Sequence, residues 1–355
     1  MNKQVVNSYN EWDLLEEVIV GNIDFATIPS WHIMLDATMP DKHKPLFKKK
    51  GGELFDKHFV EKAKRDLDEL VNILQREGVI VKRPDVVQFN KPFNTPKWGC
   101  KGGVYAAMPR DILFVIGNEI IESPLSWRSR YFEIDAYRTL IKSYFKEGCI
   151  WTSAPKPQLL DDLYDNNYDS NYTEPETKYV INEFEPVFDA ADFIRCGRDI
   201  FYQKSNVTNQ FGVDWLSRHL AGRFKFHEIK VKDRQPMHID ATFMPLAPGK
   251  VLVNESRIAY LPDMLKKWEI LIAPKPCISN NFDLFMSSNW ISMNILMLDH
   301  KRVIVEKEEV TLIESFKKWG FEPILCSFRN FNRFGGSFHC ATTDIRRKGK
   351  LESYF

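Results

Sequence analysis

The stretch "HFVEKAKRDLDELVNILQREGVIVKRPD", residues 58–85, carries the pattern from which the fold of this chain can be predicted. Its first part places apolar residues at helical spacing, namely Ala63, Leu67, Leu70, Val71 and Leu74. Gly78 follows these residues and is a helix stop signal. The apolar run after Gly78 is typical of a β-strand. The stretch therefore predicts one unit of helix, glycine and strand.

The same order recurs along the chain, although no fixed sequence period accompanies it. Residues 311–328, "TLIESFKKWGFEPILCSF", again indicate a helix, Gly320 and a strand. Further predicted elements are helices within 131–149 and 207–222, a strand at 14–22, and a strand or a hairpin at 111–124. This alternation is typical of a mixed α/β architecture with strands inside and helices outside. We expect one domain over residues 1–355.

The composition indicates an ordinary globular protein and argues against several kinds of partner. Of the 355 residues, 44% are hydrophobic and 27% are charged, and the formal net charge is +1. Proteins that bind nucleic acid or an anionic membrane surface usually carry a basic excess, so we expect neither partner. No window has the ~18 uninterrupted apolar residues of a membrane span.

The cysteines and the N-terminal residues indicate a reducing compartment. The cysteines stand singly, at positions 100, 149, 196, 277, 326 and 340, and no CxxC pair favours a zinc ribbon or a dithiol redox site. The N-terminal stretch has no apolar segment of the secretory type, and its acidic residues are untypical of a transit peptide. We therefore expect a cytoplasmic protein with reduced thiols.

Polar side chains of the types that carry out catalysis or binding stand in four otherwise apolar stretches of the sequence. They are Asp111 in "YAAMPRDILFVIGN", Asp189 and Asp192 in "EPVFDAADFIRCGRDIF", His238 and Asp240 in "PMHIDATF", and Cys340 in "RFGGSFHCATTDIRR". If residues 236–243 form a strand, His238 and Asp240 point to the same face. Structural explanations stand beside these: Asp111 in a turn after Pro109, Asp189 as a helix N-cap, His238 as a structural histidine, and Cys340 as a buried structural thiol.

Taken together, these groups match the chemistry of a guanidinium substrate. A guanidinium is planar, cationic and rich in donors, so carboxylates can bind it in its plane. A cysteine above that plane can attack the central carbon while a histidine transfers protons. A metal site is the alternative for a histidine with carboxylates. We predict no metal, because the carboxylates outnumber the single histidine and the flanking residues are apolar.

At this point the chain resembles a known family nearly from end to end. It is similar to the glycine amidinotransferases, the inosamine-phosphate amidinotransferases and the cyanobacterial toxin-pathway amidinotransferases of the saxitoxin type. The stretches that carry the resemblance are "YNEWDLLEEVIVG" (9–21), "MPRDILFVIGNEIIESP" (108–124), "FDAADFIRCGRDIF" (188–201), "PMHIDATF" (236–243), "SSNWISMNILMLD" (287–299) and "GGSFHCATTDIRRKGKLESY" (335–354). The resemblance implies a five-bladed, pseudo-fivefold α/β-propeller of ββαβ modules (pentein-like), a single catalytic domain and a homodimer.

The resemblance also implies residue roles. Cys340 is the expected nucleophile, His238 the general acid and base, and Asp189 the carboxylate that orients it, as in a Cys–His–Asp triad. Asp111 and Asp240 are the expected guanidinium clamps. The groups expected to hold the carboxylate of the donor are Arg257, Tyr105 and Ser288, with Ser287 beside them. The implied reaction takes the amidino group of L-arginine through a covalent amidino-cysteine to a small amine, releases L-ornithine and uses no cofactor.

The sequence bears on two features of the implied reaction, namely the cover over the intermediate and the identity of the acceptor. The covalent intermediate must be shielded from water, and residues 159–179, rich in Asp, Asn and Tyr, are predicted to form an exposed loop that is a candidate cover. Glycine-using members carry Asn-Pro-Met-His before the histidine, whereas this chain has Gln235 in place of that asparagine and keeps Met237. The longer amide reshapes the acceptor pocket, which favours a secondary-metabolite acceptor of the saxitoxin type over glycine.

Two other functions fit part of the pattern. An arginine deiminase-like hydrolase would use the same kinds of groups but release citrulline. A non-catalytic arginine-binding protein would keep the carboxylates but would need neither Cys340 nor His238. The long matches around residues 287–299 and 335–354 favour the transferase.

Overall fold

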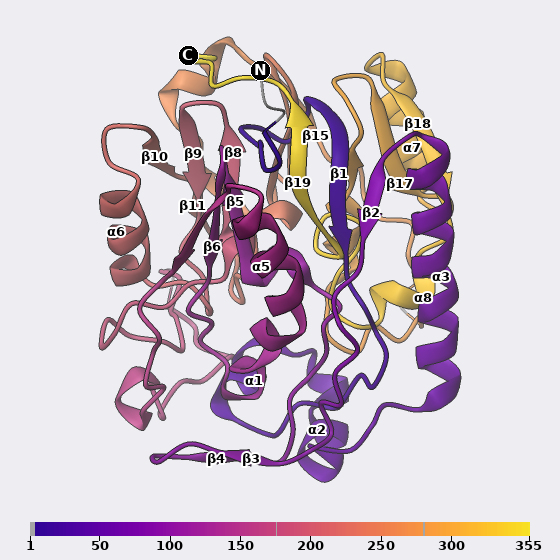
Figure 1. Ribbon diagram of the computed structural model, residues 1–355. Helices are drawn as coiled ribbons and strands as arrows, with labels where there is room; N and C mark the ends of the chain where they lie inside the picture. Colours follow the sequence, from indigo (N-terminus) through magenta and orange to yellow (C-terminus); the bar gives the residue numbers. More distant parts are fainter. Residues whose placement is uncertain (1–3, 175, 280) are drawn as a thin grey trace.

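The computed structural model describes residues 4–174, 176–279 and 281–355, and its sheets repeat one strand order (Figure 1). Within these residues there are five three-stranded sheets, in each of which the middle strand pairs antiparallel with one neighbour and parallel with the other. In strand order the sheets are β19 (Thr342–Lys348), β1 (Leu14–Val20), β2 (Ile80–Lys82); β5 (Leu113–Ile116), β6 (Glu119–Glu122), β7 (Ile150–Ser153); β8 (Phe193–Cys196), β9 (Asp199–Tyr202), β10 (Lys225–Glu228); β12 (Phe243–Ala247), β13 (Lys250–Val253), β15 (Glu269–Ile272); and β16 (Leu296–Met297), β17 (Arg302–Glu306), β18 (Glu322–Cys326).

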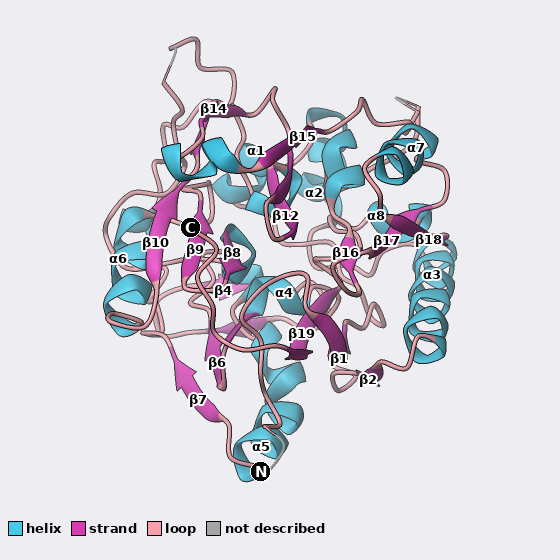
Figure 2. Cartoon of the chain, turned by 90° about the horizontal axis from the view of Figure 1, so that it is seen from above, coloured by secondary structure: helices cyan, strands magenta, loops and turns pink. Residues whose placement is uncertain are grey.

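Helices lie outside these sheets and connect their parallel strands. The helices that directly precede the last strand of a sheet are α3 (Lys57–Arg76), α5 (Arg138–Lys146), α6 (Gln210–His219) and α7 (Val310–Lys318). The shorter α-helices are α1 (Ile33–Thr38), α2 (Lys44–Lys50), α4 (Pro109–Ile112) and α8 (Arg329–Asn332), and two-stranded ladders join β3 (Phe93–Asn94) to β4 (Gly99–Cys100) and β11 (Lys230–Val231) to β14 (Ile258–Tyr260). The architecture is mixed α/β, as the sequence predicts. Figure 2 shows the sheets in separate sectors around the middle of the molecule.

The units of helix, glycine and strand are confirmed. Gly78 lies between α3 and β2 with φ +83°, and Gly320 lies between α7 and β18 with φ +86°. A Cβ added at either glycine would have no heavy atom within 4 Å. The backbone conformation, and not lack of space, therefore requires glycine there. Within 131–149 the predicted helix is shorter than expected, because residues Glu133–Tyr137 form a 3₁₀ turn before α5 begins.

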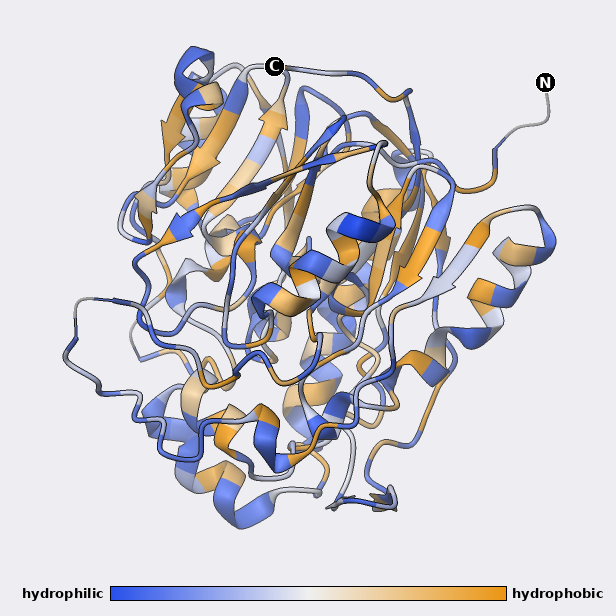
Figure 3. Ribbon diagram, turned by 90° about the vertical axis from the view of Figure 1, so that its left-hand side faces the viewer, coloured by the Kyte–Doolittle hydropathy of each residue, from blue (hydrophilic) through white to orange (hydrophobic). Residues whose placement is uncertain are grey.

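The amphipathic pattern of α3 packs as predicted. Ala63, Leu67, Leu70 and Leu74 are fully buried in the main apolar cluster, and Val71 is half-buried against it. Figure 3 shows largely apolar strands inside and helices striped with polar and apolar residues. Among the described residues, no helix is both long enough and apolar enough to cross a membrane.

Segments from the two ends of the chain share one sheet. β1 pairs with β19 along its length, from Leu14 opposite Lys348 to Val20 opposite Thr342. The last strand is therefore fixed by the first, and the turn just before β19 is held against the middle of the molecule. Cys340 lies in that turn.

Candidate active site

The candidate catalytic and guanidinium-binding residues lie in short turns, each just before the edge strand that pairs antiparallel with the middle strand of its sheet. Asp111 is in α4 before β5, and Asp189 immediately precedes the 3₁₀ turn η5 (Ala190–Asp192) before β8. His238 immediately precedes the turn η6 (Ile239–Ala241), which contains Asp240, before β12. Cys340 precedes β19. The turns contact one another, α4 with η5 and η5 with η6, so groups from different sheets meet.

The expectation of a strand at His238 is wrong. His238 has φ +55°, in the left-handed region, and the next residues form a 3₁₀ turn. A turn, and not strand alternation, therefore brings His238 and Asp240 into one site. Asp111 lies in a helical turn after Pro109, which was the alternative to a strand position. Asp189 occupies an N-cap position but its side chain makes no capping hydrogen bond, so its carboxylate is free to bind other groups.

His238 lies between two buried carboxylates. Its Nε2 is 3.0 Å from Asp189 Oδ2, and its Nδ1 is 3.7 Å from Asp111 Oδ1. Burial disfavours the imidazolium, but Asp111 and Asp189 outweigh burial and raise the pKa of His238 well above its usual value. The two carboxylates therefore favour the protonated ring of His238, with Nε2 donating to Asp189.

Arg130 forms ion pairs with the same two carboxylates that contact His238. Its Nη1 is 2.9 Å from Asp111 Oδ2 and 3.3 Å from Asp189 Oδ2, and its Nη2 is 2.9 Å from Glu133 Oε2. All of these side chains are buried. Burial opposes the charge of Arg130, yet these carboxylates hold its pKa well above the usual value. Arg130 thus fixes the position of both Asp111 and Asp189.

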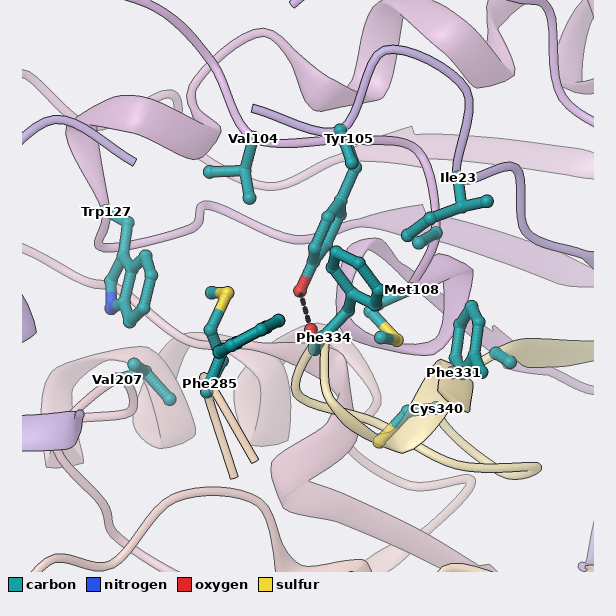
Figure 4. Packing of buried hydrophobic residues seen from close by; sticks show 14 of the residues in the cluster. Ile23, Val104, Tyr105, Met108, Trp127, Val207, Phe285, Phe331, Phe334 and Cys340 are labelled. Carbon is teal, nitrogen blue, oxygen red and sulfur yellow. Dashed lines mark hydrogen bonds between the residues drawn. The ribbon is translucent and has the colours of Figure 1, made fainter. Parts of the chain in front are cut away.

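Cys340 is buried and belongs to an apolar cluster that also contains Phe331 and Phe334 (Figure 4). Its Sγ lies 3.3 Å from Asp240 Oδ2. Burial, followed by the charge of Asp240, raises the pKa of the Cys340 thiol to about 12, although His238 acts in the opposite direction. Burial and Asp240 therefore favour the protonated thiol.

A neighbouring histidine, His339, holds Asp240 in its charged form. His339 Nδ1 is 2.8 Å from Asp240 Oδ2, and His339 Nε2 is 3.2 Å from Glu11 Oε2. Burial alone would favour the neutral acid, but the hydrogen bond and charge of His339 hold the pKa of Asp240 below its usual value. Asp240 thus presents a carboxylate to the site even without substrate.

The two acids of "DAAD" have different surroundings. Asp189 binds His238, as described above, whereas Asp192 accepts hydrogen bonds from Ser205 Oγ and Thr208 Oγ1, both at 2.6 Å. Burial raises the pKa of Asp192 to about 7. Of the two acids, Asp189 is therefore placed to orient the histidine, and Asp192 braces the loop at 205–208.

A cavity of about 440 Å³ opens onto Cys340. From the predicted set it is lined by Gln235, Met237, His238, Asp240, Arg257, Ser287, Ser288 and Cys340. Arg257 donates to Ser288 Oγ at 2.9 Å, and its Nε is 3.0 Å from Asp233 Oδ2. Ser287 Oγ donates to the Asn332 carbonyl at 2.9 Å. A cavity of this size suits an amino acid or a somewhat larger ligand.

Tyr105 lies apart from the other residues that are predicted to bind the carboxylate of the donor. Its hydroxyl donates to the Phe334 carbonyl at 2.8 Å, as Figure 4 shows, and the buried ring does not line the cavity. The predicted contact of Tyr105 with a donor carboxylate stays a prediction. In this structure Tyr105 fixes the backbone next to Gly335, which does line the cavity.

Three of the groups are close enough to bind one metal ion. Ligand atoms of Asp111, His238 and Cys340 lie within 4.8 Å of one another. However, the Arg130 guanidinium is 2.9 Å from Asp111, and the raised pKa of His238 favours a protonated ring that cannot ligate. This arrangement suits a planar organic cation better than a metal ion.

Comparison with known proteins places the chain in a family. No model of a protein family matches the chain. The chain is 51% identical over 349 residues to an L-arginine:L-lysine amidinotransferase of Pseudomonas savastanoi pv. phaseolicola, covering 98% of this chain and 96% of that protein. It is 49% identical over 358 residues to the mitochondrial glycine amidinotransferase of Xenopus tropicalis, covering 99% and 85%. The solved structure of an amidinotransferase of the saxitoxin biosynthetic pathway from Microseira wollei superposes with a TM-score of 0.95 at 49% identity, covering 99% of both chains.

The chain belongs to the amidinotransferase family. The predicted family and the prediction of an enzyme are thereby confirmed. The relatives name different acceptors at nearly equal identity, so overall similarity does not select among them.

Sequence reasoning missed three buried residues of this amidinotransferase site. Arg130 stands in "SWRSR", His339 directly precedes Cys340, and Asn294 follows "SSNWISM". Asn294 contacts Cys340, and its contacts are described below. Apart from Glu133, three positions from Arg130, their partners lie tens to hundreds of positions away in the sequence, so no local pattern marks the contacts that join them to the site. A charged residue in a turn between apolar segments was the available signal for Arg130.

The segment predicted as a cover of the amidinotransferase site, residues 159–179, contacts a strip of the chain that lines the cavity. None of the described residues within 159–179 lines the cavity. Tyr172 donates to the Arg234 carbonyl at 3.2 Å, and Arg234 Nη1 donates to the Tyr172 carbonyl at 2.6 Å. This contact holds the strip 233–237, which does line the cavity. Segments 38–42 and 282–291 contribute to the lining of the cavity instead.

Proposed function

We propose that this amidinotransferase moves the amidino group of L-arginine to a small amine through an amidino-Cys340 intermediate and releases L-ornithine. The observation that carries the proposal is that two carboxylates, Asp111 and Asp240, lie near the Cys340 thiol; Asp240 and Cys340 line the cavity, whereas Asp111 does not. Cys340 Sγ is 3.3 Å from Asp240, and it lies within the same 4.8 Å group as an Asp111 oxygen. Asp111 Oδ1 is buried and accepts no hydrogen bond, so it can accept one from a guanidinium.

Binding of the donor changes the charge balance at the nucleophile. A guanidinium between Asp111 and Asp240 offsets the negative charge that raises the pKa of Cys340. The same cation disfavours the proton on His238, which then leaves to solvent. Neutral His238 can take the thiol proton, and the resulting thiolate attacks the guanidino carbon. A new C–S bond forms at this step.

His238 then completes both halves of the reaction. It gives its proton to the departing nitrogen as the C–N bond breaks, and L-ornithine leaves. An acceptor amine enters, attacks the amidino carbon and loses a proton to His238. The C–S bond breaks, and its electron pair returns to Cys340. Asp189, 3.0 Å from Nε2, keeps the ring in place throughout.

Arg257 is the proposed anchor for the carboxylate of the donor. It lines the cavity beside Ser288, to which it donates, and Ser287 lies next to it. A guanidinium recognises a carboxylate with two parallel hydrogen bonds. The acceptor binds against the strip of Gln235 and Met237, and we propose a small amine of secondary metabolism as that acceptor. L-Lysine, the acceptor in the name of the relative at 51% identity, is the first alternative, and glycine is the second.

We further propose a pseudo-fivefold propeller that forms one catalytic domain and acts as a cytoplasmic homodimer. Support for the propeller is the repeated strand order and the meeting of turns from different sheets at Cys340. Support for one domain is that the turns carrying Asp111, Asp189, His238 and Cys340 come from four parts of the chain. Light scattering of the purified protein tests the dimer.

Product analysis tests the activity. The protein is incubated with L-arginine alone and with L-lysine, glycine, hydroxylamine or an amino ketone, and ornithine, citrulline and urea are measured. Ornithine that forms only with an acceptor, together with the amidinated acceptor, supports the proposal and names the amine. Citrulline without an acceptor would indicate a deiminase. A Cys340→Ala variant that still turns over would exclude the covalent route, whereas retained arginine binding without turnover supports it.

A further inference from the structure

One of the sheets contributes a turn to the centre that the proposed mechanism does not yet use. It is the turn η8 (Asn289–Met293), which ends at Asn294 just before β16 and contacts η6. Turns at the same place in the other sheets carry Asp111, Asp189, His238 with Asp240, and Cys340. Asn294 is fully buried. Its position in the fold therefore matches that of the reacting groups.

The side chain of Asn294 binds the nucleophile through both of its polar atoms. Its Nδ2 donates to Cys340 Sγ at 3.0 Å. Its Oδ1 accepts from the backbone N–H of Cys340 at 3.0 Å and of Ser337 at 3.1 Å. These two N–H donors fix the orientation of the amide, because a flipped amide would place an NH₂ group against them. The side-chain Nδ2–H of Asn294 must then point at the sulfur of Cys340.

The charges around Cys340 make such a donor necessary. Asp240 contacts the sulfur, and Asp111 adds a second negative charge near it. Tyr105 adds a polar group, and His238 is a cation nearby. A thiolate in this apolar, acidic site needs hydrogen-bond donors. The donor of Asn294 is neutral and fixed, so it acts whether His238 carries a proton or not.

We propose that Asn294 is a catalytic residue that stabilises the Cys340 thiolate, a role that rests on the proposed amidino-cysteine mechanism. The Nδ2–H bond strengthens as Cys340 loses its proton to His238, before the C–S bond forms. It strengthens again when the acceptor amine attacks and the C–S bond breaks, because the electron pair returns to the sulfur. The Oδ1 contacts hold the turn 337–340 so that Sγ faces the cavity.

Asn294→Asp separates the two halves of this role. The variant keeps an oxygen for the backbone N–H groups of Ser337 and Cys340 but replaces the donor to sulfur by a carboxylate oxygen. The readout is the rate of carbamidomethylation of Cys340 by iodoacetamide between pH 6 and pH 10, followed on the Cys340 peptide by mass spectrometry so that other cysteines do not contribute. The rate profile of the variant should move to higher pH by about one unit or more. The kcat should fall roughly 100-fold, with arginine binding retained.

The matched control is Asn332→Ala. Asn332 Nδ2 donates to the Gly336 carbonyl at 3.1 Å, so this change also removes a bond to the same loop but leaves the sulfur untouched. Its alkylation profile should coincide with that of the wild type. Because Asn294→Asp also places a negative charge beside the sulfur, the neutral Asn294→Ser variant is measured with it, and its profile must move to higher pH as well. Asn294→Ser also serves alone if Asn294→Asp does not fold. A coincident profile for a folded Asn294 variant would reduce Asn294 to a structural brace. The alkylation readout needs no acceptor, so it reports on Asn294 even if the product assay contradicts the proposed transfer.

Discussion

A single carboxylate oxygen of Asp189 receives hydrogen bonds from His238 at 3.0 Å and from Arg130 at 3.3 Å. Asp189→Asn weakens both contacts and exposes His238 to a group that can present an N–H instead of an acceptor. We expect kcat to fall at least about 100-fold, since His238, the proposed general acid and base, loses its orientation. Steady-state kinetics with L-arginine and the best acceptor measure this change. Asp192→Asn is the control from the same motif, and activity close to wild type is expected for it; equal losses in both variants would contradict the assignment.

Asp192 also gives a pH prediction for stability. Burial raises its pKa to about 7 in the folded protein, whereas an aspartate in an unfolded chain titrates at about 4. Between these values the folded state binds more protons, so this group makes stability fall as the pH rises from about 4 to about 7. Asp192→Asn removes the effect. Between pH 5 and pH 8 the free energy of unfolding of the variant should gain roughly 1–3 kcal/mol relative to wild type, measured by urea denaturation. Parallel pH curves for the two proteins would contradict it.

At the scale of elements, the junction of helix and strand depends on one backbone conformation. Gly320 has φ +86°, and a Cβ added there would meet no heavy atom within 4 Å, so substitution changes only the backbone preference. Gly320→Ala should lower the free energy of unfolding by about 1 kcal/mol. Asn accepts the left-handed conformation more readily than Ala, so Gly320→Asn should cost less. A loss equal in both variants, measured by urea denaturation, would point to packing as the cause.

These junctions also explain what the sequence could predict. The helix, glycine and strand units are local, and α3, β2, α7 and β18 appear where the periodicity places them. The turns that carry the chemistry are decided by distant contacts. His238 adopts a positive φ without being glycine, and nothing near it in the sequence indicates this. The contacts of Arg130 with Asp189 and of Asn294 with Cys340 join turns of different sheets, so periodicity and motif spacing could not identify these two residues.

At the scale of the whole molecule, a buried ion network ties Glu11, which precedes β1, to the last strand, β19. Arg195 Nη2 lies 2.7 Å from Glu11 Oε2 and 2.7 Å from Asp344 Oδ2. Burial opposes ionisation of Glu11, but Arg195 and Arg110 hold its pKa well below the usual value. Glu11 also contacts His339, which supports Asp240. The network therefore connects the closure of the β1–β19 sheet to the charge of a proposed guanidinium clamp.

Glu11→Gln tests whether this connection is both structural and functional. Removing one charge leaves Arg195 with one fewer buried partner, and the free energy of unfolding should fall by about 3 kcal/mol. Because His339 loses a carboxylate on one side, the hold on Asp240 should loosen and the KM for L-arginine should rise. Glu314→Gln, on the exposed face of α7, is the control and should leave both quantities unchanged. Urea denaturation and steady-state kinetics measure the two effects. A variant that is less stable but has an unchanged KM would show that the network closes the fold without supporting the clamp, because the charge of Asp240 would then not depend on Glu11.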